Sequence, residues 1–244
     1  MNVSDILKIF SMCFKRYREI ILEIVKKIKV SAKQIKENTP EILFLGAEAI
    51  TGNPIACARL ANLIEKMVVS IPDALFYSKL DDFLRGAFQS EEDRAKMNAF
   101  LATEGDKADN GMQILNHINN ATSKQKVKYL VTATRFARAY DLPLALYFRI
   151  CNAINVVMED DLQFLSDNVG AMENVENNHF TANIHTQKLF SVSAMRTITT
   201  AWEAGDYAFT SFAKLIDICT VNFENDARYP NPRRIIEEYE EQED

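Results

Sequence analysis

The feature that most constrains this sequence is an apolar pattern near its beginning. Apolar residues recur in alternating steps of four and three from Val3 to Ile28, and again at Ile35, with Ser31 as the only break. This is the heptad period, and on an α-helix it places the apolar side chains along one edge, as in a contact between two helices. We call this edge the apolar seam; its central members are Leu7, Phe10, Phe14, Tyr17, Ile21, Ile24 and Ile28.

The length of the pattern indicates what the helix would need. No Gly or Pro interrupts the sequence before Pro40. A helix of roughly 33 residues would extend ~50 Å, which is longer than a compact domain of this size requires. Because an exposed apolar edge of that length is unfavourable in water, we expect the first helix to self-associate or to bind a helical partner.

A second periodic set in the same segment is cationic. Its members, which we call the basic face, are Lys8, Lys15, Lys29 and Lys36, and they lie away from the seam. Two interpretations remain open: a solvated helix surface, or a surface that meets an acidic partner or anionic lipid. Four acidic residues in the same segment weaken the lipid version.

The charge of the chain changes along its length. The net charge is +5 over residues 1–38, zero over 39–150 and −11 over 151–244. A basic beginning and an acidic end attract each other, within one molecule or between copies. The net charge of −6 for the whole chain argues against broad nucleic-acid binding.

The composition predicts an all-α protein. Hydrophobic residues make up 48% of the chain, while Gly (7) and Pro (6) are scarce, which favours helices with few breaks. We predict a multi-helix bundle with a long N-terminal amphipathic helix and one small β-hairpin near the C-terminus. The expected parts are a basic amphipathic helix (1–38), a helical core (39–173), a small C-terminal subdomain (174–224) and an acidic tail (225–244).

Several helix starts can be predicted from local signals. Ser90 before three acidic residues, Ser123, and Asp141 before Leu142-Pro143 all fit N-cap positions. The segment from 142 to 158 is apolar on most sides, so we expect it to be the central buried helix.

The late part of the chain contains the only segment with β character. Residues 197–202 and 207–210 are β-rich and flank a predicted turn at 203–206. Trp202, beside this turn, fits core packing best, and the alternative is an anchor of the hairpin to the helical body or to a partner. Helices on both sides would make a winged-helix-like unit, although its only cations are Lys188, Arg196 and Lys214. The acidic residues after Asn225 predict a mobile tail with some helix near Ile235.

Cysteine usage and hydropathy indicate the compartment. The four cysteines are far apart and form no C-x-x-C pair, which favours reduced, buried thiols in a cytoplasmic protein. No apolar run approaches the ~20 residues of a membrane span. A membrane-peripheral location would follow only if the basic face met lipid.

Motifs for chemistry are weak. Glu176 and His179 have the Glu-x-x-His spacing of di-iron bundles, but the sequence has no second copy. The acidic run Glu159-Asp160-Asp161 could coordinate Mg²⁺, but acids at a helix start need no metal to explain them, because the helix dipole already favours them there. We therefore predict no metal site, no cofactor and no catalytic residues. The sequence favours a non-enzymatic interaction protein, with a peripheral membrane protein or a nucleic-acid-associated regulator as alternatives.

Overall fold

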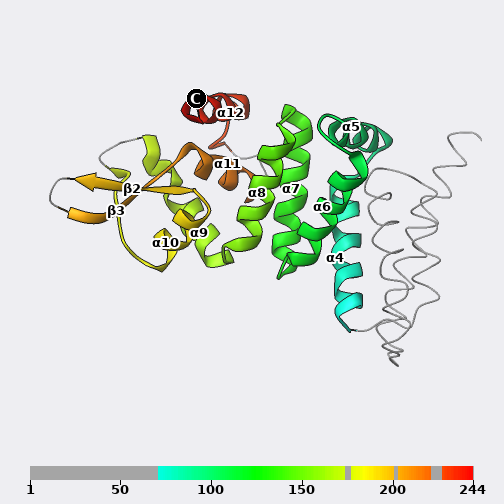
Figure 1. Cartoon of the computed structure of the whole chain (residues 1–244), viewed down its shortest axis with the longest axis horizontal. Helices are drawn as coiled ribbons and strands as arrows, with labels where there is room; N and C mark the ends of the chain where they lie inside the picture. Colours follow the sequence, from blue (N-terminus) through cyan, green and yellow to red (C-terminus); the bar gives the residue numbers. More distant parts are fainter. Residues whose placement is uncertain (1–70, 174–176, 201–202, 221–226, 244) are drawn as a thin grey trace, which may run out of the picture. The chain divides into compact units, whose positions relative to one another are not determined.

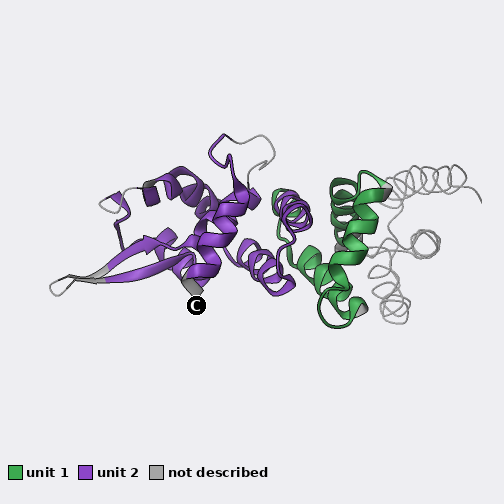
Figure 2. Cartoon of the chain, turned by 90° about the horizontal axis from the view of Figure 1, so that it is seen from above, with its two compact units in different colours: residues 1–127 green, residues 128–244 purple. Residues whose placement is uncertain are grey.

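The structure is a computed structural model in which the described residues are 71–173, 177–200, 203–220 and 227–243 (Figure 1). They are mostly helical and include one small antiparallel sheet, which confirms the predicted helical class. The apolar seam and the basic face lie outside the described residues. The chain divides into two compact units, Met1–Val127 and Lys128–Asp244 (Figure 2).

In unit 1 the described elements are α4 (Ile71–Ala87), α5 (Glu91–Leu101), α6 (Lys107–Asn120) and the first turn of α7 (Lys124–Tyr140). Helices α4 and α5 pack against α6. Their apolar faces form a core that includes Leu80, Phe83, Met97, Leu101, Ile114 and Ile118. The buried Asn110 side chain closes the connection from α5 to α6, because its Nδ2 donates to the carbonyls of Leu101 (2.9 Å) and Glu104 (2.6 Å).

Two of the three predicted helix starts are confirmed. Ser90 and Asp93 form a capping box at α5, in which the Ser90 hydroxyl accepts from the Asp93 amide and the Asp93 carboxylate accepts from the Ser90 amide. At α7 the Ser123 hydroxyl accepts from the Lys126 amide at 3.1 Å. The prediction for Asp141 was wrong. That residue has a left-handed backbone (φ 52°), and the helix begins after Pro143, which has no side-chain cap.

Unit 2 contains α8 (Leu144–Val156), the helix that the sequence led us to expect at the centre; it is largely buried, but the helix that packs against the most elements of this unit is α11 (Ser211–Thr220). Seven residues of α8 are buried, and the Tyr147 hydroxyl lies 2.9 Å from that of Thr134 on α7. Helix α11 packs against α8 and also against α9 (Glu159–Asn168). A 3-10 helix, η1 (Val169–Glu173), continues directly from α9.

The sheet of unit 2 has the strand order β1-β3-β2 and is antiparallel throughout. Its strands are β1 (Phe180–Thr181), β2 (Met195–Thr200) and β3 (Glu203–Phe209). The predicted hairpin is therefore present, but residues 203–206, expected as its turn, belong to β3. Thr200 pairs with Glu203, so the connection is the shorter one at residues 201–202, which lie outside the described residues. Between β1 and β2 the chain forms α10 (Ile184–Ser191), which packs on β2 and α9.

The acidic end of the chain forms a packed helix, α12 (Pro232–Glu243), where the sequence suggested a mobile tail with local helix. Its buried positions Ile235, Ile236 and Tyr239 lie on one face, and α12 packs against α11. The side chain of Arg149 on α8 donates to the Tyr239 hydroxyl at 2.5 Å and lies over the Phe212 ring, 4.7 Å from its centroid. Three apolar residues on one face of α12 thus suffice for packing against α11, despite the repulsion among its acidic residues.

Candidate functional site

The sequence-predicted site residues are only partly covered by the structure. The apolar seam, the basic face, Glu176 and Trp202 lie outside the described residues. His179 is exposed just before β1. No group of three or more His, Cys, Asp or Glu that could hold a metal ion occurs within the described ranges.

The acidic run at the start of α9 has one inward-facing member. Glu159 and Asp160 are exposed, whereas the side chain of Asp161 is only 4% exposed. One Asp161 oxygen accepts from the Met158 amide at 2.8 Å, which satisfies a donor that the helix start would otherwise leave unpaired. The other lies 2.9 Å from His185 Nδ1. These contacts support the helix-start interpretation of the run.

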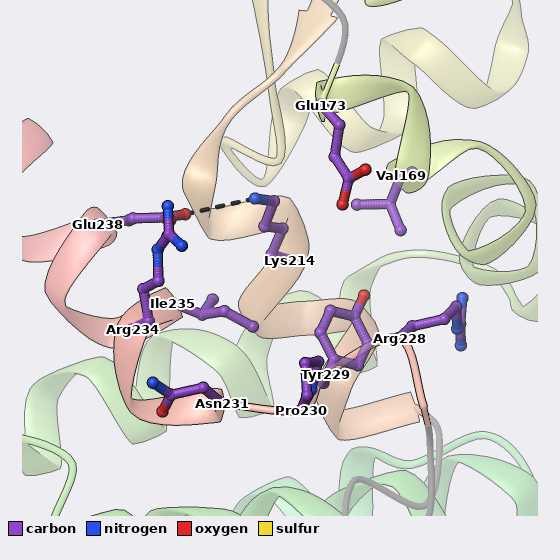
Figure 3. Close-up of a pocket in the computed structure, with 11 residues that line it drawn as sticks. Val169, Glu173, Lys214, Arg228, Tyr229, Pro230, Asn231, Arg234, Ile235 and Glu238 are labelled. Atoms are coloured by element: carbon purple, nitrogen blue, oxygen red, sulfur yellow. Dashed lines mark hydrogen bonds and ion pairs between the residues drawn. The ribbon is translucent and has the colours of Figure 1, made fainter.

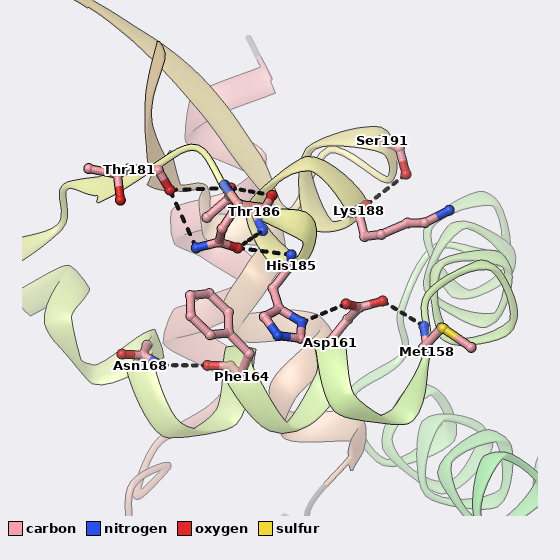
Figure 4. Close-up of polar contacts among 10 residues, drawn as sticks. Met158, Asp161, Phe164, Asn168, Thr181, His185, Thr186, Lys188 and Ser191 are labelled. Carbon is pink, nitrogen blue, oxygen red and sulfur yellow. Dashed lines mark hydrogen bonds and ion pairs between the residues drawn. The ribbon is translucent and has the colours of Figure 1, made fainter.

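His185 joins α10 to α9 (Figure 4). Besides its contact with Asp161, its ring stacks on Phe164 with centroids 5.2 Å apart and planes 14° from parallel. Phe164 also packs with Phe180 of β1 and Phe209 of β3. A carboxylate that holds one imidazole nitrogen orients the ring, as in a catalytic dyad, but here the neighbours of the ring make it a structural link between α9, α10 and the sheet.

Helix α10 is fixed at its start by a reciprocal cap. The Asn183 side chain accepts from the amides of His185 and Thr186, both at 2.9 Å, and the Asn183 amide donates to the Thr186 hydroxyl at 2.8 Å. The helix has only eight residues, so this cap and the His185 contact account for much of its local order.

Exposed large apolar side chains are concentrated in two segments of unit 2, one from the end of α8 to the start of α9 and the other in α10. Five large apolar residues are exposed among the described residues, and four of them lie in segments 156–158 and 184–190: Val156, Met158, Ile184 and Phe190. We call these four the α9–α10 surface. Met158 and Ile184 are 67% and 69% exposed, and the exposed acids Glu159 and Asp160 directly follow Met158 in the chain. A concentration of exposed apolar side chains beside charged ones is typical of protein–protein contact surfaces.

A separate pocket of about 580 Å³ lies between η1, α11 and the start of α12 (Figure 3). One wall is formed by Lys214 of α11 together with Arg234 and Glu238 of α12. The Glu238 carboxylate pairs with Lys214 Nζ at 3.3 Å and with Arg234 Nε at 3.0 Å. Glu173 faces this group from η1, as Figure 3 shows.

Tyr229, which lines this pocket, is held in place by a buried carboxylate. Asp217 is 0% exposed and accepts from the Tyr229 hydroxyl; Arg228 Nη1 lies 3.3 Å from the same carboxylate. Arg228 also donates to the carbonyl of Ser166 at 3.1 Å, which ties the segment before α12 to α9. The Tyr229 ring is therefore held in a fixed position where it lines the pocket.

The buried thiols of unit 2 are unsuited to nucleophilic chemistry. Burial raises the pKa of Cys151 to about 12, and burial together with nearby Cys151 and Asp217 raises that of Cys219 well above 9.0. Burial likewise raises the pKa of Tyr147 well above 10.0. All three groups stay protonated at neutral pH, and a protonated thiol is a poor nucleophile.

Comparisons with protein-family models, curated proteins and solved structures found no match to this chain. In the part of the chain that the structure describes, no helix has the length and apolar character to cross a membrane.

The pocket, the Asp161–His185 contact and the α9–α10 surface were not predicted from the sequence. A local signal existed for α10, since Asn183 and Thr186 have the spacing of a reciprocal cap. The pocket gave no local signal, because its residues are spread over sequence positions 169 to 238 and only the fold brings them together.

Proposed function

We propose that this protein acts by binding other protein chains, and specifically by self-association in which the apolar seam of one copy docks on the α9–α10 surface of a second copy. The observation that carries the proposal is that four of the five exposed large apolar residues described, Val156, Met158, Ile184 and Phe190, fall in two short segments of unit 2. The seam supplies the matching partner: an apolar edge that, as a helix, would need a neighbour.

Charge complementarity supports a second copy as the occupant. The segment that bears the seam has a net charge of +5, and residues 151–244 have a net charge of −11. In the docked arrangement the basic face, from Lys8 to Lys36, would lie near acidic residues such as Glu159 and Asp160. Opposite charges at the rim of an apolar contact speed association and set its orientation.

Light scattering coupled to size exclusion, across micromolar to submillimolar concentrations, tests the proposal. We expect the mean mass to rise with concentration and the association to weaken as salt screens the rim charges. Phe14→Glu or Ile21→Glu in the seam, and Met158→Glu or Ile184→Glu on the acceptor side, should each abolish the rise, because a buried unpaired charge is costly. Leu75→Glu is the matched control: Leu75 is also exposed (59%) but lies in α4 of unit 1.

Two results would refute the proposal. One is a monomer of constant mass over the whole concentration range. The other is oligomerisation that Leu75→Glu disrupts as strongly as Ile184→Glu. If the monomer instead floats with anionic liposomes at low salt, the basic face serves membrane attachment, the alternative that the sequence left open.

Nucleic-acid binding is a second candidate, favoured by the strand order β1-β3-β2 and by α10 packed on β2, a winged-helix-like arrangement. Lys188 on α10 and Arg196 on β2 are exposed there. Fluorescence anisotropy with duplex DNA at rising salt tests this. If both residues contact phosphate, each change to Gln lowers the salt slope by about 1, while the exposed Lys96→Gln on α5 leaves it unchanged.

A further inference from the structure

The pocket between η1, α11 and α12 has features of a ligand site that are independent of self-association. Its volume of about 580 Å³ lies within the range of roughly 300–1,000 Å³ that small-molecule sites occupy. Its charged side chains sit on the walls, and Val169, Tyr229 and Ile235 provide an apolar part of the lining.

The wall formed by Lys214, Arg234 and Glu238 carries an excess of positive charge. The Glu238 carboxylate pairs with both cations of this wall: one of its oxygens contacts Lys214 and the other contacts Arg234. Within the described residues, the Lys214 ammonium makes that one contact, and Arg234 is bonded through Nε alone. The terminal nitrogens of Arg234 and two Lys214 protons therefore remain for a second acceptor.

The position of Lys214 makes a second acceptor favourable. Its side chain is only 24% exposed, so part of the hydration of its ammonium is lost. An anionic group that contacts both Lys214 and Arg234 would replace that hydration with charge-assisted hydrogen bonds. Arginine in particular offers paired donors that match the oxygens of a phosphate.

The wall that carries Glu173 favours a ligand group of a different kind, a hydrogen-bond donor. The Glu173 carboxylate points towards the pocket from η1 (Figure 3), and it has no ion pair or hydrogen bond among the residues described. It would accept from a hydroxyl or amine of the ligand and repel a second anionic group. Tyr229, held by Asp217, also lines the pocket; it is 8% exposed, so it offers the ligand a small aromatic contact in a fixed position.

We propose that this pocket binds a small phosphate monoester, of the size and chemistry of a nucleoside monophosphate. Its phosphate contacts Lys214 and Arg234, its apolar body lies against Tyr229, Val169 and Ile235, and its donor groups face Glu173. The phosphate supplies the negative charge that the Lys214–Arg234 wall accepts, and the ring and hydroxyls match the remainder of the lining.

Isothermal titration of the full-length protein with AMP, adenosine and inorganic phosphate tests the proposal. We expect AMP to bind more tightly than either fragment. Arg234→Gln and Lys214→Gln should each weaken AMP binding by roughly 10-fold, the effect of losing one charge-assisted contact. Arg233→Gln is the matched control, because Arg233 is the neighbouring exposed cation on α12 and does not line the pocket; it should bind AMP as the wild type does.

The Glu173→Gln substitution tests the role of Glu173 separately from that of Lys214 and Arg234. Removing this negative charge should strengthen binding of inorganic phosphate and lower the preference for AMP over phosphate, because the ligand's donors lose their charged acceptor. The proposal is wrong if AMP does not bind at millimolar concentration, or if adenosine binds as well as AMP. It is also wrong if Arg233→Gln weakens binding as much as Arg234→Gln, which would indicate general surface electrostatics. Arg234 is 74% exposed, so its substitution leaves the fold intact and keeps the test decisive.

Discussion

The buried carboxylate of Asp217 makes the Tyr229 hydroxyl a strong determinant of the stability of unit 2. Tyr229→Phe removes that hydroxyl and keeps the ring. Asp217 is 0% exposed, and its remaining contacts are Arg228 at 3.3 Å and the Thr220 hydroxyl at 3.5 Å. A lost hydrogen bond to a charged buried group costs about 1.5–3 kcal/mol. The Arg228 side chain is 41% exposed, so solvent screening limits how far it can compensate.

The charge of Asp217 sets the size of this effect, and a double-mutant cycle isolates it. Asp217→Asn keeps the shape and an acceptor for Tyr229 but removes the buried charge. In that background Tyr229→Phe should cost only about 0.5–1.5 kcal/mol, the value for a hydrogen bond between neutral groups. The difference between the two backgrounds, about 1–1.5 kcal/mol, is the coupling due to the charge.

Urea unfolding, monitored by the intrinsic fluorescence of the protein, gives these free energies of unfolding. Thermal unfolding provides a second measurement. For a chain of this length, Tyr229→Phe in the wild-type background should lower the midpoint of thermal unfolding by about 3–12 °C. The control is Tyr207→Phe, which removes the hydroxyl of a half-buried tyrosine that packs edge-on against Phe190. The reasoning is refuted if Tyr229→Phe costs less than Tyr207→Phe, or if it costs the same in the wild type and in the Asp217→Asn background.

Three further predictions concern other buried or partly buried groups. Burial and the raised thiol pKa values should prevent iodoacetamide at pH 8 from labelling Cys151 and Cys219 until the chain unfolds, as peptide mass mapping would show; rapid labelling of the native protein would contradict this. Burial lowers the pKa of His117 below its usual 6.5. As the pH falls below 6.5, the His117 imidazole therefore binds a proton in the unfolded chain before it does so in the folded protein, and this favours unfolding. Urea unfolding between pH 7 and 5 should therefore show a smaller loss of stability in His117→Asn than in the wild type, and equal losses would refute it. Arg149→Met should cost about 1–2 kcal/mol and make α12 more sensitive to limited proteolysis, since the contacts with Tyr239 and the Phe212 ring are lost; an unchanged cleavage rate would mean that α12 is held without them.

The parts of the fold that sequence reasoning predicted are those encoded by neighbouring residues. Ser90 and Ser123 cap their helices because an N-cap side chain reaches amides two or three residues ahead, whatever the rest of the chain does. Helix α8 was recognisable as a largely buried helix because it is apolar around most of its circumference, but its sequence did not reveal that α11 packs against more elements. Asp141 carried the same local signal and failed, because Pro143 set the helix start two residues later and left Asp141 in a left-handed turn.

The candidate sites depend on residues that meet only after folding, so they could not be predicted. Asp161 and His185 are 24 positions apart, and the pocket joins η1 to α12 across about 70 positions. The sequence showed Glu159-Asp160-Asp161 as three equivalent acids. Only the phase of α9 decides that Asp161 turns inward while its two neighbours stay in solvent. A single sequence carries no direct record of such pairings.

The packed state of α12 changes how the acidic end of the chain can act on a partner. A mobile acidic tail would attract cations without orientation, whereas α12 holds Glu237, Glu240 and Glu241 on its exposed side because Ile236 and Tyr239 are buried on the other. A fixed set of carboxylates can match a cationic series of regular spacing, such as the basic face from Lys8 to Lys36. If association depends on this match, the double change Glu240→Lys and Glu241→Lys should weaken association strongly. The loss should exceed the one caused by added salt at a concentration that reduces the attraction between the same charges to a similar extent on average. If the acidic end acts only through its total charge, reversals at two other exposed acids of unit 2 outside the proposed contact, Asp167 and Glu173, should weaken association equally.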